Sequence, residues 1–494
     1  MTVSSNPIIN IIYNHKDDED DIIKGKQDNN ISHSNITIDN DQVFDDQELL
    51  DESDSTINTS FQLNKDEFIL LLKWTWPILV SNLLFSVAYI FINLVFVGHI
   101  GKNEFAAVAL GNTWQFATSA LSIGTLNAMD TLISQSFGAK QFKLIGLTVQ
   151  RAIIVSIVFN TLLSILWCFT GNILILIRQD PEIAMITQSY TIYMIPGLWF
   201  GCGLTILQKY LQTQGIMIPC ILIGILFNLL NIVLNYLFIN IMGFGVIGSS
   251  MATSIAKTFG FFGLLGWIYH FKLHQSPIQT WFGFDKETFS LDGLKQYLSI
   301  GVPSGLQLVF EGWGFEILTL MAGLLNPVSL DAHSITMNFN LLNFMLPFSL
   351  SIAVSIRIGQ LLGAKKVETI KKSLRVAFII TTIIILISST FQYTTRNIIG
   401  KLYSKDKEVI HLVSGLIPLS ALSKLFDGYQ TTCQGIVRGV GKNSLGAILN
   451  FGSFYLIGLP LSAAFTFSHM IPLLYHTVYG LWWGLNIGLF NRLE

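Results

Sequence analysis

Four carboxylates inside otherwise apolar stretches are the residues of this 494-residue chain best placed to do chemistry: Glu311, Glu316, Asp427 and Asp130. A carboxylate at bilayer depth costs several kcal/mol on most scales, so each one needs a physical reason. Burial disfavours the ionised form, whereas a nearby cation favours it. A buried Glu can therefore hold either a proton or an organic cation, and competition between the two could drive exchange.

Glu311 and Glu316 occur in the segment Leu308-Val-Phe-Glu-Gly-Trp-Gly-Phe-Glu. A five-residue spacing on a helix separates two side chains by about 140° and about 7.5 Å along the axis. Both can border one cavity, or one can face it while the other contacts a neighbouring helix. Trp313 and Phe315 could add cation–π attraction worth about 2 kcal/mol when desolvated. The alternative for each Glu is a protonated group bonded to a backbone carbonyl, or a salt-bridged helix anchor.

Asp130 and Asp427 have two interpretations each. Asp130 could act in transport, or it could be a helix-end charge paired with Lys140 or Lys143. Asp427 could also act in transport, or it could be an ordinary interfacial charge, since it is close in depth to Lys424.

The composition shows what kind of elements must position these groups. Hydrophobic residues make up 51% and charged residues 12% of the chain, whereas soluble domains carry about 25% charged residues. We therefore expect an all-α membrane protein with twelve apolar stretches, each long enough for about 20 helical residues. The expected spans are 74–97, 105–134, 147–170, 185–207, 217–241, 247–270, 297–323, 328–356, 375–396, 408–430, 444–466 and 473–491.

Residues 1–64 differ from the rest of the chain. They hold 14 of the 31 acidic and 3 of the 29 basic residues, a net charge of −11, while the rest of the chain carries +9. Such a segment cannot bury enough apolar surface to offset its ordering entropy, so we expect a disordered acidic tail. Two six-helix bundles, 65–290 and 291–494, are expected to follow.

Lys and Arg are unevenly distributed between the two sets of loops. With an inside N-terminus, fifteen of these residues lie in or at the edges of cytoplasmic loops and six in the opposite loops. This asymmetry predicts that both termini are cytoplasmic. The membrane itself, plasma or vacuolar and vesicular, is left open.

A repeat relates the two halves. Gln135-Ser-Phe-Gly138-Ala-Lys recurs as Gln360-Leu-Leu-Gly363-Ala-Lys, at a shift of 225. Further matches at shifts of 220–226 are Phe105–Leu110 with Leu330–Ile335, Pro77 with Pro303, and Gln214-Gly215 with Gln434-Gly435. Because six spans separate the copies, the repeat is parallel, and paired halves of this kind place a transport site at their interface near the midplane.

With these motifs, residues 70–490 resemble the multidrug and toxin extrusion (MATE) family. The stretches that carry the resemblance are Val97-Gly-His-Ile-Gly101, Asp130 to Ala139, Glu311-Gly-Trp-Gly-Phe-Glu316, Gln360 to Ala364, Phe426-Asp-Gly-Tyr-Gln430 and Gln434 to Gly439. The Glu-x-Trp-x-aromatic-Glu block resembles the eukaryotic branch. The resemblance implies twelve helices in two bundles forming a V, and export of organic cations or xenobiotics in exchange for protons.

The resemblance also implies roles for individual residues. Glu311 and Glu316 match the carboxylates of the C-terminal bundle, Asp427 matches the acidic residue of the tenth span, and Asp130 matches an acidic position before the Gln-x-x-Gly-Ala motif. Some animal members have a further Glu in the eighth span, where this chain has Asn338. The resemblance therefore does not extend to the broad dicationic selectivity of those members.

Our interpretation is a secondary active antiporter, a monomer without a cofactor, that works by alternating access. Its partners would be small organic cations, protons and the lipid bilayer, with no nucleic acid. Sodium coupling, an organic-anion or metabolite cargo, and a non-transporting receptor or scaffold are the alternatives. An enzyme is not expected, because no nucleophile–base constellation or metal-ligand spacing occurs.

Overall fold

Each of the twelve apolar stretches contains a helix in the structure, a computed structural model that describes residues 65–275, 278–469 and 471–491. The predicted tail, residues 1–64, lies outside the described residues. The described residues belong to one compact unit, Asn64–Glu494, and contain helices and turns but no strand. The all-α prediction is therefore confirmed.

The first half begins with a helix over Lys65–Gly98, which includes a π-helical segment η2 (Leu83–Ala88) and α3 (Tyr89–Gly98). It continues with α4 (Lys102–Thr125), α5 (Ala128–Gly138), α6 (Phe142–Cys168), α7 (Thr170–Leu176), α8 (Pro181–Tyr193), α9 (Ile195–Gln212), α10 (Ile218–Asn235), η3 (Tyr236–Ile241) and α11 (Gly245–His270).

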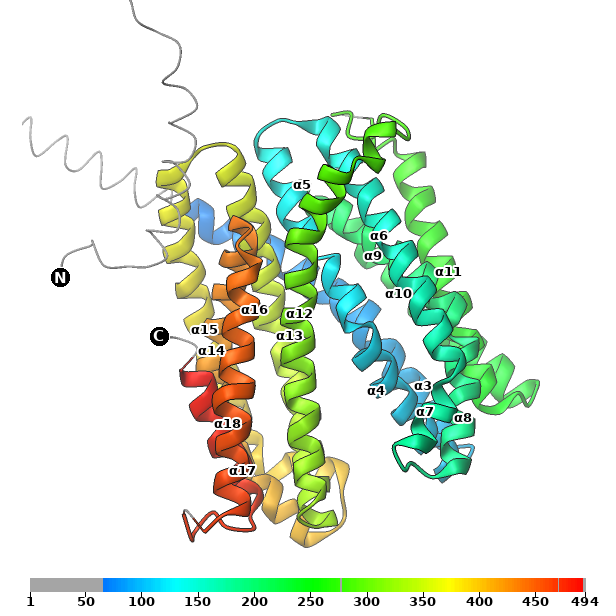
Figure 1. Cartoon of the computed structure of the whole chain (residues 1–494), viewed down its shortest axis with the longest axis vertical. Coiled ribbons are helices and arrows are strands. Elements are labelled where there is room, and N and C mark those ends of the chain that lie inside the picture. The colour runs from blue at the N-terminus through cyan, green and yellow to red at the C-terminus, as the bar shows by residue number, and fades with distance from the viewer. Residues whose placement is uncertain (1–64, 276–277, 470, 492–494) are drawn as a thin grey trace, which may run out of the picture. The chain divides into compact units, whose positions relative to one another are not determined.

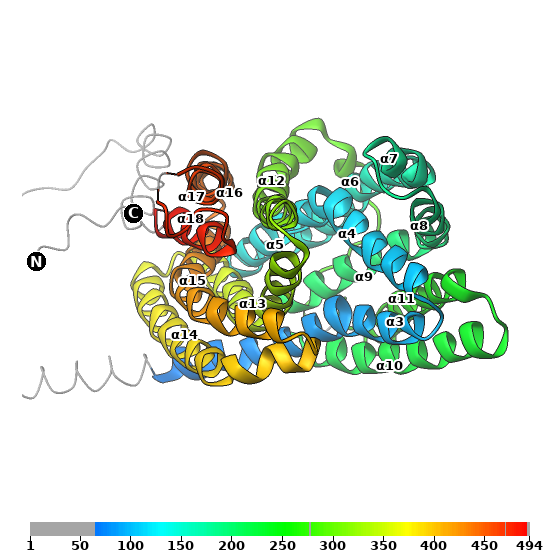
Figure 2. The same ribbon diagram turned by 90° about the horizontal axis from the view of Figure 1, so that it is seen from below.

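The second half begins after a connecting segment that contains a 3₁₀ turn, η4 (Lys286–Phe289). Its helices are α12 (Leu291–Gly323), α13 (Pro327–Gly363), α14 (Val367–Tyr403), α15 (Lys407–Val440), α16 (Asn443–Phe451), η5 (Gly452–Gly458), α17 (Leu459–Phe467) and α18 (Val478–Phe490). Figure 2 shows α4, α5, α12 and α13 at the centre, with α14–α18 on one side and α6–α11 on the other (Figures 1 and 2).

Length and composition single out eight of the described helices as able to cross a membrane, and nine if α8 and α9, bent by 50°, count as one span. The remaining three predicted spans are α4 with α5, α12, and the 13-residue α18. The predicted span 105–134 is not one helix, because α4 ends at Thr125 and α5 begins at Ala128. The α8–α9 bend coincides with Pro196, which lacks the backbone N–H that would continue the helix.

The two halves approach closely where α5 crosses α13. A Cβ added at Gly138 would overlap the carbonyl of Gln360, and one added at Gly363 would overlap the carbonyl of Gln135. The four motif residues of the repeat thus form one reciprocal backbone contact. Only glycine permits this approach, because any side chain would push the two helix backbones apart.

The helices α4 and α12 form a second contact between the halves. A Cβ at Gly124 would overlap the backbone of Gly305. Trp313 Nε1 donates a hydrogen bond to the carbonyl of Ala117, at 3.1 Å. The contact thus extends along α12 for at least two turns, from Gly305 to Trp313.

Backbone conformation identifies the register of the repeat. Gly215 (φ 80°) and Gly441 (φ 87°) both follow the last turn of a helix in the left-handed region, and the shift between them is 226. Lys140 and Lys365 share the same conformation at a shift of 225. The predicted equivalence of Gln214-Gly215 with Gln434-Gly435 is therefore wrong, because Gly435 lies within α15 and only Gly441 ends it.

The segment between the halves is held against α6. Lys143 Nζ forms ion pairs with Asp285 and Glu287, at 3.0 and 2.9 Å. Gln150 donates to the carbonyl of Gly283, at 2.6 Å. The backbone N–H of Glu287 and the Lys143 ammonium together hold the pKa of Asp285 below its usual range. The connection is thus attached to the first half.

We expect Gly138→Ala to lower the free energy of unfolding by about 1–3 kcal/mol, because the added methyl group overfills a backbone contact. Gly266→Ala is the matched control, since nothing lies within 4 Å of the corresponding Cβ in α11. Thermal unfolding of the two variants in detergent is the measurement. Equal melting temperatures would contradict the close crossing.

Candidate functional site

Glu311 lies in the middle of α12 and is bound by two uncharged side chains of the second half. Its Oε2 accepts hydrogen bonds from Gln434 Nε2 on α15, at 3.3 Å, and from Asn450 Nδ2 on α16, at 3.2 Å. Asn450 also donates to the carbonyl of Gln307, one turn before Glu311, at 3.0 Å. The carboxyl group therefore faces the interior of the second half.

Aromatic rings lie beside this group. Phe310 contacts Phe451 and Tyr455, with ring centroids 5.2 and 5.7 Å apart, and Phe451 stacks on Tyr455 at 5.4 Å. Such a cluster supplies an apolar, polarisable surface next to the carboxyl group. The combination suits a hydrophobic cation better than a small hydrated ion.

Glu316 has different surroundings from Glu311. Its side chain is half-buried, and no hydrogen bond or ion pair joins it to another described residue. The structure thus keeps the two glutamates in separate environments along α12.

Trp313 and Phe315 contact protein groups. Trp313 is 47% exposed and bonds across to α4 through its indole N–H. Phe315 packs edge-on against Phe454, with ring centroids 5.4 Å apart. Their predicted cation–π contribution stays a prediction.

Asp427 is part of a buried ion pair in α15. Its Oδ2 lies 3.2 Å from Lys424 Nζ, and both side chains are nearly inaccessible. Lys424 Nζ also lies 5.3 Å from the centroid of the Phe344 ring. The carboxylate charge is thus compensated within its own helix by the lysine that the sequence indicated. Asn338, by contrast, is exposed on α13.

Asp130 lies between the two halves and pairs with partners that the sequence did not indicate. Lys209 Nζ on α9 lies 2.9 and 2.7 Å from its two oxygens, and Arg438 Nη1 on α15 lies 3.6 Å from Oδ2. All three residues are buried. The expected partners Lys140 and Lys143 are wrong, because Asp130 points into the protein and Lys143 binds the connecting segment.

Further polar contacts join the halves at this end of the molecule. Gln135 Nε2 donates to the carbonyl of Gly439, at 3.0 Å, and Gln360 Nε2 donates to the carbonyl of Thr213, at 2.9 Å. Each bond runs from one half to the other, and the two are equivalent under the repeat. Arg357 on α13 also pairs with the buried Glu67 of the first helix. The end of the molecule at α5 and α13 is therefore closed.

The buried cations were not predicted from the sequence. The sequence pattern assigns three basic residues to loops or loop edges: Lys209, Arg357 and Arg438. Within the spans, only carboxylates stand out as functional groups. The sequence did contain a sign of buried positive charge, since each of these basic residues directly adjoins an apolar run. An acidic side chain at membrane depth requires a counter-charge or amide partners, so a search for both signs would have found them.

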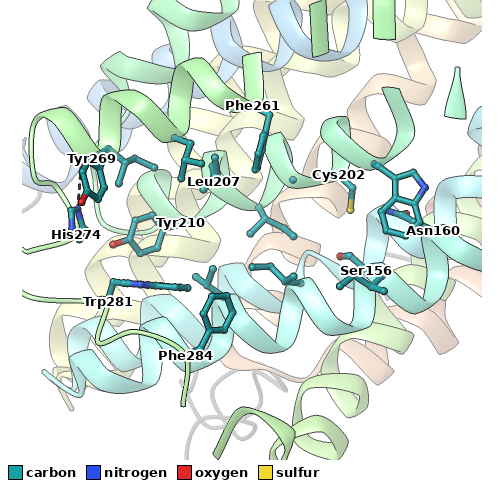
Figure 3. Close-up of a pocket in the computed structure, with 18 residues that line it drawn as sticks. Ser156, Asn160, Cys202, Leu207, Tyr210, Phe261, Tyr269, His274, Trp281 and Phe284 are labelled. Carbon is teal, nitrogen blue, oxygen red and sulfur yellow. Dashed lines mark hydrogen bonds between the residues drawn. The ribbon is translucent and has the colours of Figure 1, made fainter. Parts of the chain in front are cut away.

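The first half contains an apolar pocket of about 480 Å³ between α6, α9 and α11. Figure 3 shows Trp281, Phe284 and Tyr210 toward one end and Ser156, Asn160 and Cys202 toward the other. None of the four carboxylates lines it. Within the described part of the chain, no group of three or more His, Cys, Asp or Glu could hold a metal ion.

Comparisons with known proteins agree on one family. The sequence model of the MatE family matches twice, at residues 77–237 and 303–464, which confirms the internal repeat. Multidrug and toxin extrusion protein 1 of Mus musculus is 35% identical over 80% of this chain and 68% of its own. The Homo sapiens protein of the same name is 34% identical, over 86% and 72%. The crystal structure of the eukaryotic MATE transporter AtDTX14 superposes with a TM-score of 0.80 at 25% identity, over 87% of this chain and 94% of that one.

Removing the charge of Asp130 should destabilise the protein strongly. Asp130→Asn leaves Lys209 and Arg438 buried without a full counter-charge, which typically costs about 3–5 kcal/mol. Thermal unfolding in detergent, followed by size-exclusion chromatography, should show a clear loss of stability. Glu368→Gln, which removes an exposed ion pair with Lys371, is the control and should leave the melting temperature unchanged. A stable Asp130→Asn protein would refute the buried network.

Proposed function

The chain belongs to the multidrug and toxin extrusion (MATE) family, and from that premise we propose that it exports organic cations in exchange for protons. Proteins of this family are transporters, so an enzyme and a non-transporting receptor or scaffold are no longer alternatives. What we propose beyond family membership is the class of cargo, the coupling ion and the direction of transport.

The observation that carries it is the environment of Glu311. Two of its partners, Gln434 and Asn450, are amides, which donate hydrogen bonds without themselves supplying a positive charge. An ionised carboxylate held in this way keeps its attraction for a cation, and protonation removes that attraction. The rings of Phe310, Phe451 and Tyr455 add an apolar surface that suits a hydrophobic cargo.

Transport would follow from exposing this one group to each side of the membrane in turn. When the cavity opens to the cytoplasm, ionised Glu311 binds an organic cation. The halves then rock, the cavity opens outward, and a proton from the external or luminal side neutralises the carboxyl group and releases the cation. The protonated carrier returns.

The closed end at α5 and α13 supports alternating access. It carries Lys140 and Lys365, which the charge asymmetry assigns to the cytoplasmic side, so with the proposed orientation this end would be the cytoplasmic gate in its closed state. Opening this end would break the Asp130–Arg438 contact and the bonds from Gln135 and Gln360. We assign Asp130 to this closure and Glu311 to cargo and proton.

The other predicted site residues take subsidiary places in this proposal. Glu316 is a second protonatable group on α12, and Asp427 with Lys424 anchors the interior of α15. Cytoplasmic termini, residence in the plasma membrane or a vacuolar and vesicular membrane, and a monomeric state belong to the same proposal.

Glu311→Gln should abolish uptake of a fluorescent organic cation driven by a pH gradient in inverted vesicles, because an amide cannot be ionised. Glu311→Asp keeps the charge and should retain part of the activity. Glu368→Gln, on the exposed start of α14, is the control for expression and insertion. Normal pH-driven uptake by the Glu311→Gln protein would refute the assignment.

Proton coupling can be separated from sodium coupling with purified protein in proteoliposomes. We expect a pH gradient to move the cation without sodium, and a sodium gradient to be ineffective when a protonophore clamps the pH. Uptake that follows the sodium gradient under this clamp would establish the alternative.

A further inference from the structure

Lys257 is a positively charged residue near the middle of α11, a helix of the first half that runs from Gly245 to His270. At 1.5 Å per residue, either end of the helix is about 18–20 Å away. A lysine side chain is too short to bring its ammonium group to either membrane surface from this depth. The charge therefore stays within the bundle.

The packing of α11 shows which way Lys257 points. The neighbours on its face, Thr253 and Gly260, are buried, whereas Ile255 and Phe259 on the opposite side are exposed. Lys257 itself is partly exposed. Lys257 therefore lies on the same side of α11 as these buried residues, opposite the exposed Ile255 and Phe259.

The contacts of Lys257 come from the helices on either side. Its Nζ lies 4.9 Å from the centroid of the Tyr89 ring in α3. Gly201 of α9 faces its methylene stem, and a Cβ there would lie 3.1 Å from the lysine Cδ. One turn away, Asn93 donates to Thr253 at 2.7 Å, so a polar layer adjoins the ammonium group.

Two lysines that are buried in the described helices have a different environment from Lys257. Lys209 and Lys424 each have a carboxylate oxygen within 3.2 Å. No hydrogen bond or ion pair joins Lys257 to any described residue, and its one charge contact is the Tyr89 ring. A cation at this depth is costly, and one aromatic face compensates it less fully than an anion does.

We propose that Lys257 forms an anion subsite in the first half, which binds the carboxylate group of an anionic or zwitterionic small molecule. The Tyr89 ring holds the ammonium group in place, and the missing counter-charge comes from the ligand. The first half then presents a cation and the second half the carboxyl group of Glu311. This goes beyond cation export, because it gives the carrier affinity for cargo that bears a carboxylate.

Two dyes that differ in one charge provide the test. Rhodamine 110 carries a carboxylate, and rhodamine 123 is its methyl ester. Binding of each dye to the full chain in lipid nanodiscs is measured by fluorescence polarisation, without any ion gradient. We expect Lys257→Gln to weaken rhodamine 110 about tenfold or more and to leave rhodamine 123 within about twofold. Lys257→Arg should restore the preference.

Controls keep the result independent of folding and of the proposed function. Lys401→Gln, at the exposed end of α14, should change neither affinity. Retained rhodamine 123 binding shows that the Lys257→Gln protein is folded. In the wild-type protein, benzoate should displace rhodamine 110 and methyl benzoate should not. The subsite is refuted if Lys257→Gln leaves the ratio of the two affinities unchanged, or if benzoate does not compete with rhodamine 110. Failure of proton coupling is a separate result, because it would appear only in the gradient-driven assays.

Discussion

The cost of holding a charge away from water governs the interior of this protein. Asp427 is neutralised within its own helix by Lys424. Asp130 is neutralised by Lys209 of its own half and by Arg438 across the interface between the halves. Glu311 accepts hydrogen bonds from the amide groups of Gln434 and Asn450, which orient its carboxyl group. Buried ion pairs of this kind hold the fold together, whereas the amide contacts of Glu311 are the basis of the exchange role that we propose for it.

The same partners link the chemistry to the movement of the halves. The ion pair of Asp130 with Arg438 joins α5 to α15, and the crossing at Gly138 and Gly363 brings α5 and α13 to backbone contact. Both contacts are short-range and depend on close geometry, so the rocking of the halves that we propose for transport would break them. Packed interfaces of this kind are bistable and do not deform continuously. The neutralisation of Glu311 can therefore bias a switch between two defined states.

The sequence predicted the architecture well and the partners of the buried charges poorly. Hydropathy located the helices because a segment that crosses a bilayer must make its backbone hydrogen bonds internally, so a long apolar stretch is expected to be a helix. The break between α4 and α5 was missed, since no proline or charge marks it. The partners of Asp130 were missed because Lys209 and Arg438 are far from it along the chain, and contacts at such separations depend on how the helices pack. Spacing along the chain could suggest only nearby partners for Asp130, namely Lys140 and Lys143.

The crossing of α5 and α13 has a consequence for the symmetry of the chain. Gly138 meets Gln360, and Gly363 meets Gln135, so each copy of the motif touches the other in the same way. Such mutual recognition is characteristic of isologous contacts in symmetric dimers. The single polypeptide therefore contains a contact with the symmetry of a dimer interface, in which each copy of the motif is the docking surface for the other. Because both copies lie in one chain, each can carry charges of its own, which two identical subunits could not.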